Sequence, residues 1–427
     1  MKRIKLPYGT ETVDIEIPES RFCDMLESDI NDYKPEYDQE TLVRKALENP
    51  IGTRGLADLA RGKKKIVVIA SDHTRPVPSK YMIPPMLAEI RKGSPEADIT
   101  ILVATGCHRE TTREELRDKF GDRVMREEKI VVHDCDDLDA MVRVGVLPSG
   151  GELVLNKRAV EAELLVAEGF IEPHFFAGFS GGRKSVLPGV ATRQTVLYNH
   201  NASFIASDRA RTGVLEDNPI HNDMLYAARA AGLDFILNVV INSQKEIIAA
   251  VAGAWDAAHA AGCDFLSERC RVSGRTADIV VTTNGGYPLD QNIYQAVKGM
   301  TAAETVVRKD GVIIIFAKSN DGHGGVDFYD TFGSEKDLAA IMAAIMATPS
   351  NETIPDQWQS QIFARVLQHA RVIYISDAPD AMVRGMRMIP AHSFSEALAL
   401  ADGILGSATG TVSVIPDGVS VIMSRKE

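Results

Sequence analysis

The chain has 427 residues, of which 45% are hydrophobic and 25% charged, and its formal net charge is -12 at pH 7. This composition is typical of a soluble globular protein with roughly two or three domains, and its acidity argues against nucleic acid or an anionic membrane as a partner. The five cysteines form no C-x-x-C pair, there is no signal-peptide h-region, and no apolar run spans a bilayer, so a reducing cytoplasm is expected.

Residues 1–18 alternate well enough to predict a hairpin that turns at Pro7-Tyr8-Gly9. Short apolar runs then alternate with helical stretches, which predicts mainly parallel strands covered by helices on both faces. A helix is expected through 82–92, and an Ala-rich helix over 247–267. The strands predicted in this first part of the chain cover 64–71, 98–106, 129–134, 162–170 and 234–242.

A boundary near 271–276 is followed by a second series of strands and helices. Strands are predicted over 278–286, 312–320 and 372–377, and residues 411–423 predict a terminal hairpin around Pro416-Asp417-Gly418. The sequence therefore predicts an α/β protein with two domains and mainly parallel sheets. The N-terminal domain is expected over 1–272 and the C-terminal domain over 273–427.

Residues 171–188, IEPHFFAGFSGGRKSVLP, place His174, Arg183 and Lys184 among three glycines. Glycine permits positive φ and close approach of the backbone to a ligand, lysine binds phosphate or forms covalent bonds, and histidine transfers protons near neutral pH. The segment therefore indicates an active-site loop. It departs from the P-loop pattern where Arg183 replaces the glycine before the lysine, which argues against an ATPase.

Polar side chains lie at the carboxyl ends of four of the predicted strands, where ligands bind in open α/β sheets. Each has a structural alternative: Asp72 suits a helix cap, His108 a helix start, His174 a packed core position, and Lys184 a solvated surface. The histidines lack H-E-x-x-H spacing, so by itself the sequence shows no metal site, and His200 alone is undecidable. The residues at strand ends are Asp72, His73, Arg75, His108, His174 and Asn284.

In the second domain the segment NGGYPLDQNIYQAVKG, residues 284–299, follows a predicted strand. Asp290 is expected to cap a helix on which Gln295 and Lys298 share one face. An amide and an ammonium on one face suit a carboxylate, and the alternative is an ordinary solvated face. Trp358, in the polar context PDQWQSQ, packs an interface or walls a pocket.

Together the motifs SDHTRPVP, ATGCHR, EPHFFAGFSGGRKSVLPGVA, YNH, NGGYPLDQNIYQAVKG and PDQWQSQ resemble those of the nickel-dependent lactate racemase family. The resemblance runs from about Asp72 to Trp358 without a departure at these positions. It implies a racemase that interconverts the D and L enantiomers of a small 2-hydroxy acid, lactate first, in a cleft between two domains. The partners it implies are that acid and cofactor-synthesis proteins.

The resemblance also implies a cofactor, the nickel-pincer nucleotide pyridinium-3,5-bisthiocarboxylic acid mononucleotide. In this family a thioamide joins the cofactor to the lysine that corresponds to Lys184, and the histidine that corresponds to His200 binds the nickel. The loop expected to bind the cofactor consists of Asp72, His73, Thr74 and Arg75.

The family assigns proton transfer to two histidines, here His108 and His174, which alternate as acceptor and donor on opposite faces of the substrate. The substrate carboxylate is held by two residues, and two others lie near the substrate. These four correspond to Gln295, Lys298, Tyr294 and Trp358.

The chemistry explains why histidines alone would not suffice. The Cα–H of a 2-hydroxy acid is a very weak acid, whereas a hydride acceptor avoids a carbanion. Three alternatives remain open: a racemase or epimerase of a larger acid (malate-, aryl- or sugar-acid-like), a non-catalytic protein that holds the cofactor or a carboxylate, and a phosphoryl-transfer enzyme. Tyr294 and Trp358 favour a small substrate, and intact His108 and His174 count against a non-catalytic protein.

Overall fold

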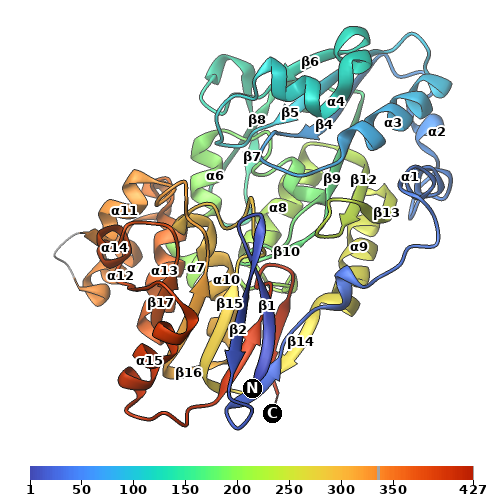
Figure 1. Ribbon diagram of the computed structural model, residues 1–427. Coiled ribbons are helices and arrows are strands. Elements are labelled where there is room, and N and C mark those ends of the chain that lie inside the picture. The colour runs from blue at the N-terminus through green and yellow to red at the C-terminus, as the bar shows by residue number, and fades with distance from the viewer. Residues whose placement is uncertain (334–336, 427) are drawn as a thin grey trace. The chain divides into compact units, whose positions relative to one another are not determined.

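The structure is a computed structural model that describes residues 1–333 and 337–426. The chain divides into two compact units, each built around one six-stranded sheet (Figure 1). Unit 1 comprises Met1–Asp29, Asn201–Ala206 and the chain from Arg269 onward, and unit 2 comprises Ile30–His200 and Ser207–Glu268. No helix within the described residues is long and apolar enough to cross a membrane.

The sheet of unit 2 has the strand order β13-β12-β9-β4-β5-β6, in which only β13 is antiparallel to its neighbour. Its strands are nearly continuous apolar runs, as expected where helices cover both faces. The strands are β4 (Lys65–Ser71), β5 (Asp98–Ala104), β6 (Lys129–Val132), β9 (Leu164–Phe170), β12 (Leu233–Ile241) and β13 (Ile247–Ala254). The helices in this part of the chain include α1 (Gln39–Glu48), α2 (Leu56–Ala60), α3 (Ser79–Gly93), α4 (Arg113–Glu127), α5 (Lys157–Val160), α6 (Arg193–Asn199), α8 (Pro219–Ala230) and α9 (Trp255–Cys270). Two hairpins, β7–β8 (Met141–Val146, Glu152–Asn156) and β10–β11 (Pro173–His174, Gly178–Phe179), complete unit 2.

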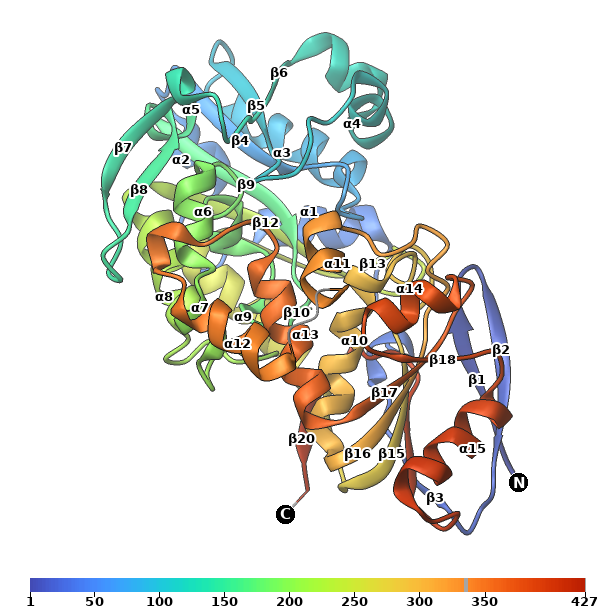
Figure 2. The ribbon, with the colours of Figure 1, turned by 90° about the vertical axis from the view of Figure 1, so that its left-hand side faces the viewer.

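The sheet of unit 1 is entirely parallel, in the order β18-β17-β16-β15-β19-β3 (Figure 2). Its strands are β3 (Phe22–Met25), β15 (Ala277–Thr283), β16 (Val307–Phe316), β17 (Arg371–Ile375), β18 (Ile389–Ala391) and β19 (Val412–Ile415). Its helices include α7 (Ala202–Ala206), α10 (Ile293–Val306), α11 (Val326–Gly333), α12 (Leu338–Ala347), α13 (Gln357–His369), α14 (Asp380–Gly385) and α15 (Phe394–Leu405).

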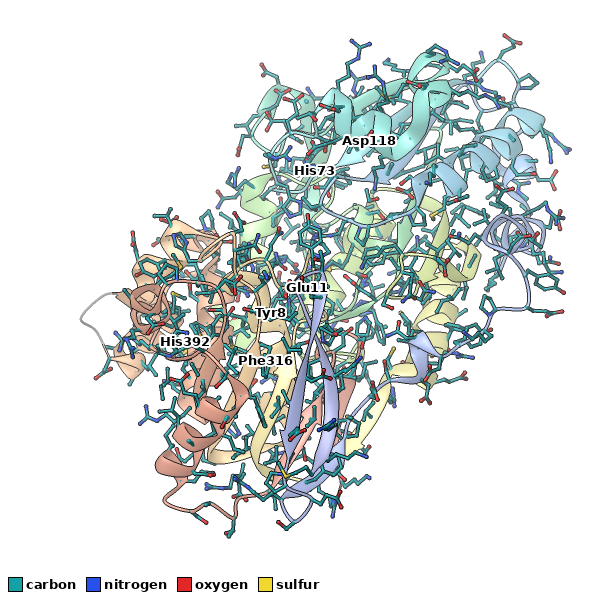
Figure 3. The ribbon with its side chains drawn as sticks, viewed as in Figure 1. Tyr8, Glu11, His73, Asp118, Phe316 and His392 are labelled. Atoms are coloured by element: carbon teal, nitrogen blue, oxygen red, sulfur yellow. The ribbon has the colours of Figure 1, made fainter. Side chains whose placement is uncertain are left out.

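The predicted N-terminal hairpin forms, as β1 (Lys2–Tyr8) and β2 (Glu11–Ile17), with Gly9 and Thr10 between the strands. It belongs to unit 1, whereas the predicted N-terminal domain over 1–272 includes it. The period-two pattern explains this, because one face of the hairpin carries Ile4, Leu6, Ile15 and Ile17, which share a core with strand residues of unit 1. Tyr8 packs against this core, which includes Phe316 (Figure 3).

The strands predicted between residues 64 and 242, and those near 278, 312 and 372, are confirmed to within a few residues. The prediction of a helix over 247–267 was wrong in its first half, because Ile247–Ala254 pairs antiparallel with β12. Gly253 marks the same region: its φ is +142°, and a Cβ there would lie 2.1 Å from the carbonyl oxygen of Ile51, with which it forms a β-bridge. Tertiary pairing thus overrides the helix propensity of the alanines.

The predicted terminal hairpin over 411–423 was also wrong. β19 lies between β15 and β3 in the sheet, and β20 (Ile422–Arg425) pairs in parallel with β14 (Arg271–Gly274). The connecting Pro416-Asp417-Gly418 does not turn the chain back, because Gly418 donates its N–H to the carbonyl of Thr283 at 3.1 Å.

Candidate active site

Three neighbouring strands of unit 2 end shortly before residues that were predicted to form the site. β4 ends before Asp72, β5 ends before His108, and β9 ends before His174. The strands are parallel and adjacent in the order β9-β4-β5, so their carboxyl ends form one edge. Ligands of open α/β sheets bind at this edge.

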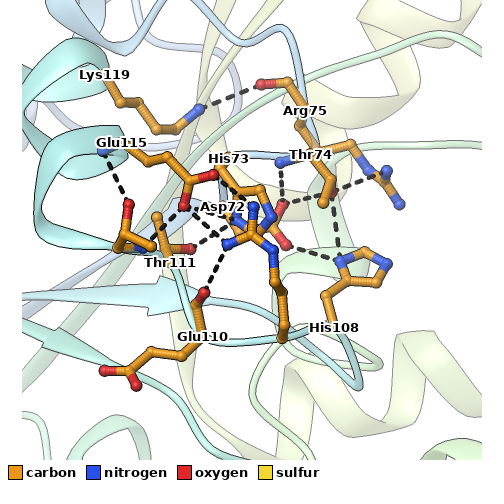
Figure 4. Close-up of polar contacts among 11 residues, drawn as sticks. Asp72, His73, Thr74, Arg75, His108, Glu110, Thr111, Glu115 and Lys119 are labelled. Atoms are coloured by element: carbon orange, nitrogen blue, oxygen red, sulfur yellow. Dashed lines mark hydrogen bonds and ion pairs between the residues drawn. The ribbon is translucent and has the colours of Figure 1, made fainter. Parts of the chain in front are cut away.

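Asp72 and His108 form a hydrogen-bonded pair at this edge (Figure 4). The carboxylate Oδ2 lies 2.7 Å from Nδ1 of His108, and Oδ1 accepts the hydroxyl of Thr74 at 2.7 Å. Burial would raise the pKa of Asp72, but the hydrogen bond and charge of His108, with Thr74, hold it below its usual value. Asp72 is therefore not the cap of a helix, since the residue before α3 is Pro78.

The two side chains of this pair differ in their exposure and in their hydrogen-bond roles. Asp72 is buried with 1% of its side chain exposed, whereas the side chain of His108 is 43% exposed. A carboxylate only accepts, so Nδ1 of His108 carries the proton and Nε2 carries the lone pair. The arrangement is that of a general base oriented by a buried acid.

The loop that contains Asp72 is anchored at both ends by one buried carboxylate, Glu168 on β9. Oε1 of Glu168 accepts hydrogen bonds from the backbone and hydroxyl of Ser71, at 2.9 and 3.0 Å, and from the hydroxyl of Ser79 at 3.0 Å. Within the loop, His73 contacts the hydroxyl of Thr111 at 3.0 Å (Figure 4). The loop between Ser71 and Ser79 is thus held independently of any ligand.

Arg75 lies in the same loop and is exposed. Its Nη1 donates to the hydroxyl of Thr74 at 3.2 Å, and Lys119 donates to its backbone carbonyl at 3.4 Å (Figure 4). An exposed guanidinium in an anchored loop suits the recognition of an anionic group, because its forked donors match carboxylate and phosphate oxygens.

A second group of predicted residues surrounds the ring of Phe176. The ring of His174 lies 4.5 Å and that of His200 5.2 Å from the Phe176 ring, both edge-on, and Nζ of Lys184 lies 5.7 Å from its centroid. Phe176 is 4% exposed. Its sequence context does not distinguish it, because an aromatic residue in an apolar stretch is usually a core residue.

His200 has the form that a metal-binding histidine requires. It follows α6, and its Nδ1 donates to the carbonyl of Val196 at 3.0 Å, which leaves the lone pair on Nε2. Burial, with a smaller contribution from the charge of Lys184, lowers the pKa of His200 to about 3. The imidazole is therefore neutral at physiological pH.

The loop before Lys184 does not present a phosphate cradle. Gly181 and Gly182 have φ of 76° and 54°, but the N–H of Gly182 donates to Oδ1 of Asn238 at 2.8 Å and that of Lys184 to the carbonyl of Gly181 at 3.2 Å. A P-loop directs such N–H groups at phosphate oxygens. Here they are used within the protein, so the phosphoryl-transfer alternative loses its structural basis.

Unit 1 carries the remaining predicted residues on α10 and α13. α10 is capped by Asn292, whose Oδ1 accepts from the N–H of Gln295 at 2.9 Å. The predicted cap Asp290 was wrong, because its carboxylate instead accepts from the N–H groups of Gly9 at 2.6 Å and Lys318 at 3.3 Å. Asn284 is structural: it is fully buried, and its Oδ1 accepts from the N–H of Gly299 at 2.9 Å.

Tyr294 and Gln295 are held differently within this unit. The hydroxyl of Tyr294 donates to Oδ1 of Asp356 at 2.8 Å, two residues before Trp358, and burial raises the pKa of Asp356. Oε1 of Gln295 is buried and has no hydrogen-bond partner among the residues that the structure describes. Such an oxygen calls for a donor from a ligand or a water. Asp356 was not selected from the sequence, where an acid before a helix suggests only a cap.

The chain matches two family models, that of the lactate racemase N-terminal domain over residues 8–213 and that of the lactate racemase C-terminal domain over residues 272–423. It is 53% identical to the lactate racemase of Thermoanaerobacterium thermosaccharolyticum over 427 residues, which covers all of both chains. It is 50% identical to the lactate racemase of Lactiplantibacillus plantarum over 424 residues, 99% of this chain and 100% of that one.

Solved structures agree with these matches. The lactate racemase apoprotein from Thermoanaerobacterium thermosaccharolyticum superposes with a TM-score of 0.96 at 52% identity, covering both chains completely. A Thermotoga maritima protein superposes with a TM-score of 0.65 at 18% identity over 92% of this chain and 100% of its own, which shows a shared fold alone.

Proposed function

The chain belongs to the lactate racemase family and is an isomerase, and from this premise we propose that it interconverts D- and L-lactate. The observation that carries the proposal is the edge where Asp72 orients His108 and where His174, Lys184 and His200 surround Phe176. Relatives that share about half of its residues along the whole chain bear the same name.

The cofactor in this proposal is the nickel-pincer nucleotide, and the residues of unit 2 fit it. The neutral imidazole of His200 offers a nitrogen donor of the kind that nickel binds. Lys184 supplies an amine beside the same aromatic ring, and the anchored loop at Asp72–Arg75 supplies a guanidinium for an anionic nucleotide. When bound, the cofactor supplies a hydride acceptor and donor for the substrate Cα.

The residues of the chain handle the proton and the orientation. His108 takes the hydroxyl proton of one enantiomer at Nε2, and the carboxylate of Asp72 stabilises the imidazolium that results. His174 handles the hydroxyl proton for the other enantiomer. Its Nδ1 accepts the N–H of Ala177 at 3.3 Å, so in the neutral ring Nε2 carries the proton. To accept the substrate proton at Nε2, the ring must first move its proton to Nδ1, which breaks the contact with Ala177. The hydrogen bonds thus assign the two neutral histidines opposite tautomers.

The assignment of substrate binding follows from the chemistry of α10. Gln295 and Lys298 hold the substrate carboxylate, since they lie one turn apart and combine an amide with an ammonium. Tyr294 is fixed by Asp356 and, with Trp358, limits the substrate to a small side chain. A larger 2-hydroxy acid is the alternative that a substrate panel separates.

The test uses full-length protein produced together with a cofactor-synthesis pathway. We expect L-lactate to approach a racemic mixture, with about one nickel per chain and a covalent adduct on Lys184 by mass spectrometry. His108→Asn and His174→Asn should each lower kcat by about 10²-fold or more while the adduct remains. Loaded protein that turns over only malate or an aryl or sugar acid would reassign the substrate, and absence of the adduct would refute the cofactor assignment.

A further inference from the structure

Arg183 is a buried cation that the proposed reaction does not use. Its side chain is fully buried, and its guanidinium donates to three backbone carbonyls of the preceding loop. The distances are 2.7 Å to Ala177, 2.8 Å to Phe179 and 3.2 Å to Gly181. One side chain thus bonds alternate peptide groups over the five residues that lead from Phe176 towards Lys184.

This alternation fixes the loop from both sides. In a trans peptide the C=O and the following N–H point in opposite directions. Since the carbonyls of Phe179 and Gly181 face Arg183, the N–H groups of the next residues face away, and they are also bonded. Ser180 N–H donates to the carbonyl of Glu172 at 2.9 Å, and Gly182 N–H donates to Asn238 at 2.8 Å.

Two histidines connect the guanidinium to the helices behind the loop. Nε of Arg183 donates to Nδ1 of His221 on α8 at 2.9 Å, and Nη1 lies 3.1 Å from Nε2 of His259 on α9. Gly182 permits this approach, because a Cβ there would lie 2.6 Å from the His259 ring. Burial and the charge of Arg183 lower the pKa of His221 to about 3, so His221 accepts instead of repelling.

Nothing in this arrangement is a conventional ion pair. Among the residues described, no carboxylate lies within ion-pair distance of Arg183, and burial lowers the pKa of Arg183 to about 10. A buried cation without a carboxylate partner lowers the stability of the fold. Its presence here is explained if the loop requires the hydrogen-bond geometry of the guanidinium. Lysine offers three donors on a single nitrogen, whereas arginine offers five in a rigid fork.

We propose that Arg183 is a positioning residue that fixes the 177–182 loop so that Lys184 is held in place for covalent attachment of the cofactor. The inference rests on the proposed function, since it deepens the role given there to Lys184. Its geometry is local: Lys184 follows Arg183 in the short 3-10 helix η3 (Gly182–Ser185), and its own N–H is bonded to Gly181 at 3.2 Å.

The test compares Arg183→Lys with Arg21→Lys in full-length protein produced with a cofactor-synthesis pathway. Arg21 is a matched control, because it is 6% exposed and donates to Asp402 at 2.7 Å and to a backbone carbonyl at 2.9 Å within unit 1. Both variants should lower Tm. Only Arg183→Lys should lower the fraction of chains with a Lys184 adduct, by about tenfold or more, as measured by intact mass and peptide mapping. An adduct fraction equal to that of Arg21→Lys would overturn the inference.

Two further measurements keep the result interpretable. If Arg183→Lys does not fold, Gly182→Ala leaves the arginine in place but displaces the loop from His259, and the same loss of adduct is expected. In cofactor-free protein, amide hydrogen exchange of 177–182 should rise at least tenfold in the Arg183 variant alone; unchanged exchange would also refute the inference. If wild-type protein carries no adduct, the proposed function fails, and this exchange measurement still decides whether Arg183 holds the loop.

Discussion

At the scale of single residues, a substitution of Asp72 tests whether the orientation of His108 affects turnover independently of cofactor attachment. Asp72→Asn keeps the shape of the side chain but removes the charge that stabilises the imidazolium and that selects the Nδ1–H tautomer. We expect kcat for lactate to fall by about 10²-fold or more with the Lys184 adduct retained. Steady-state kinetics on loaded protein, with the adduct quantified in the same sample, measures both.

The acid side of the pH profile provides a check on this assignment. The pKa of Asp72 lies below its usual value, so this carboxylate stays ionised throughout the range in which histidines titrate. Asp72→Asn removes a charge that the wild-type protein keeps at every pH in that range, so the loss of kcat should be present throughout it. Full activity of Asp72→Asn at any pH in this range would contradict the orienting role.

The residues at the strand ends were within reach of sequence reasoning, whereas their partners were not. Asp72, His108 and His174 follow apolar strands whose parallel order brings them to one edge. Phe176 contacts the ring of His200, and Asp356 accepts a hydrogen bond from Tyr294, and in both cases the partner lies in another motif. From the sequence alone, Phe176 has the pattern of a core aromatic residue and Asp356 that of a helix cap. The tautomers of the histidines depend on hydrogen bonds that only three-dimensional coordinates specify.

At the scale of elements, strand β13 shows where local propensity fails. Its sequence, IIAAVAGA, consists of small and apolar residues and suits a helix, yet it forms the antiparallel edge of the sheet. The partner that decides this, β12, is a buried apolar strand with an open edge, and pairing satisfies its backbone groups. β19 and β20 were misassigned for the same reason, because each pairs with a strand far from it in the chain.

Gly253 in β13 gives a prediction of defined sign. Gly253→Ala combines φ +142, which L side chains rarely adopt, with a Cβ only 2.1 Å from the Ile51 carbonyl oxygen, so backbone must move. We expect a loss of stability of about 2 kcal/mol or more. Gly403→Ala is the control: it lies within α15, nothing lies within 4 Å of its Cβ, and it should stabilise by about 0.5–1 kcal/mol. Urea unfolding of both variants measures the difference.

At the scale of the whole molecule, each of the two units is formed by more than one segment of the chain. It begins in unit 1, runs through unit 2, contributes Asn201–Ala206 to unit 1, returns, and passes to unit 1 at Arg269. Composition and periodicity place a boundary near 271–276, a few residues beyond the last passage. They do not locate the first, because the alternating hairpin of residues 1–18 is an amphipathic element that suits either core.

The two units also differ in how they respond to acid. Four buried histidines, His133, His200, His221 and His259, lie in unit 2, and burial lowers the pKa of each below the value of 6.5 expected in an unfolded chain. Below pH 6.5 the unfolded chain therefore binds protons that the folded unit does not. The stability from these groups is complete above pH 6.5 and decreases as the pH falls towards their folded values, by at most about 1.4 kcal/mol per pH unit for each histidine.

This asymmetry predicts that unit 2 unfolds before unit 1 when the pH is lowered from 7 to 5. The chain has two tryptophans, Trp255 in unit 2 and Trp358 in unit 1, so each unit carries its own fluorescent reporter. In cofactor-free protein, the Trp358→Phe variant should show a urea midpoint that falls by more than that of Trp255→Phe over this range. His221→Asn, which removes one titrating group and keeps an acceptor for Arg183, should reduce the pH dependence of the first variant only. Equal pH dependence of the two midpoints would mean that the units unfold as one cooperative structure or that the buried histidines do not govern acid stability.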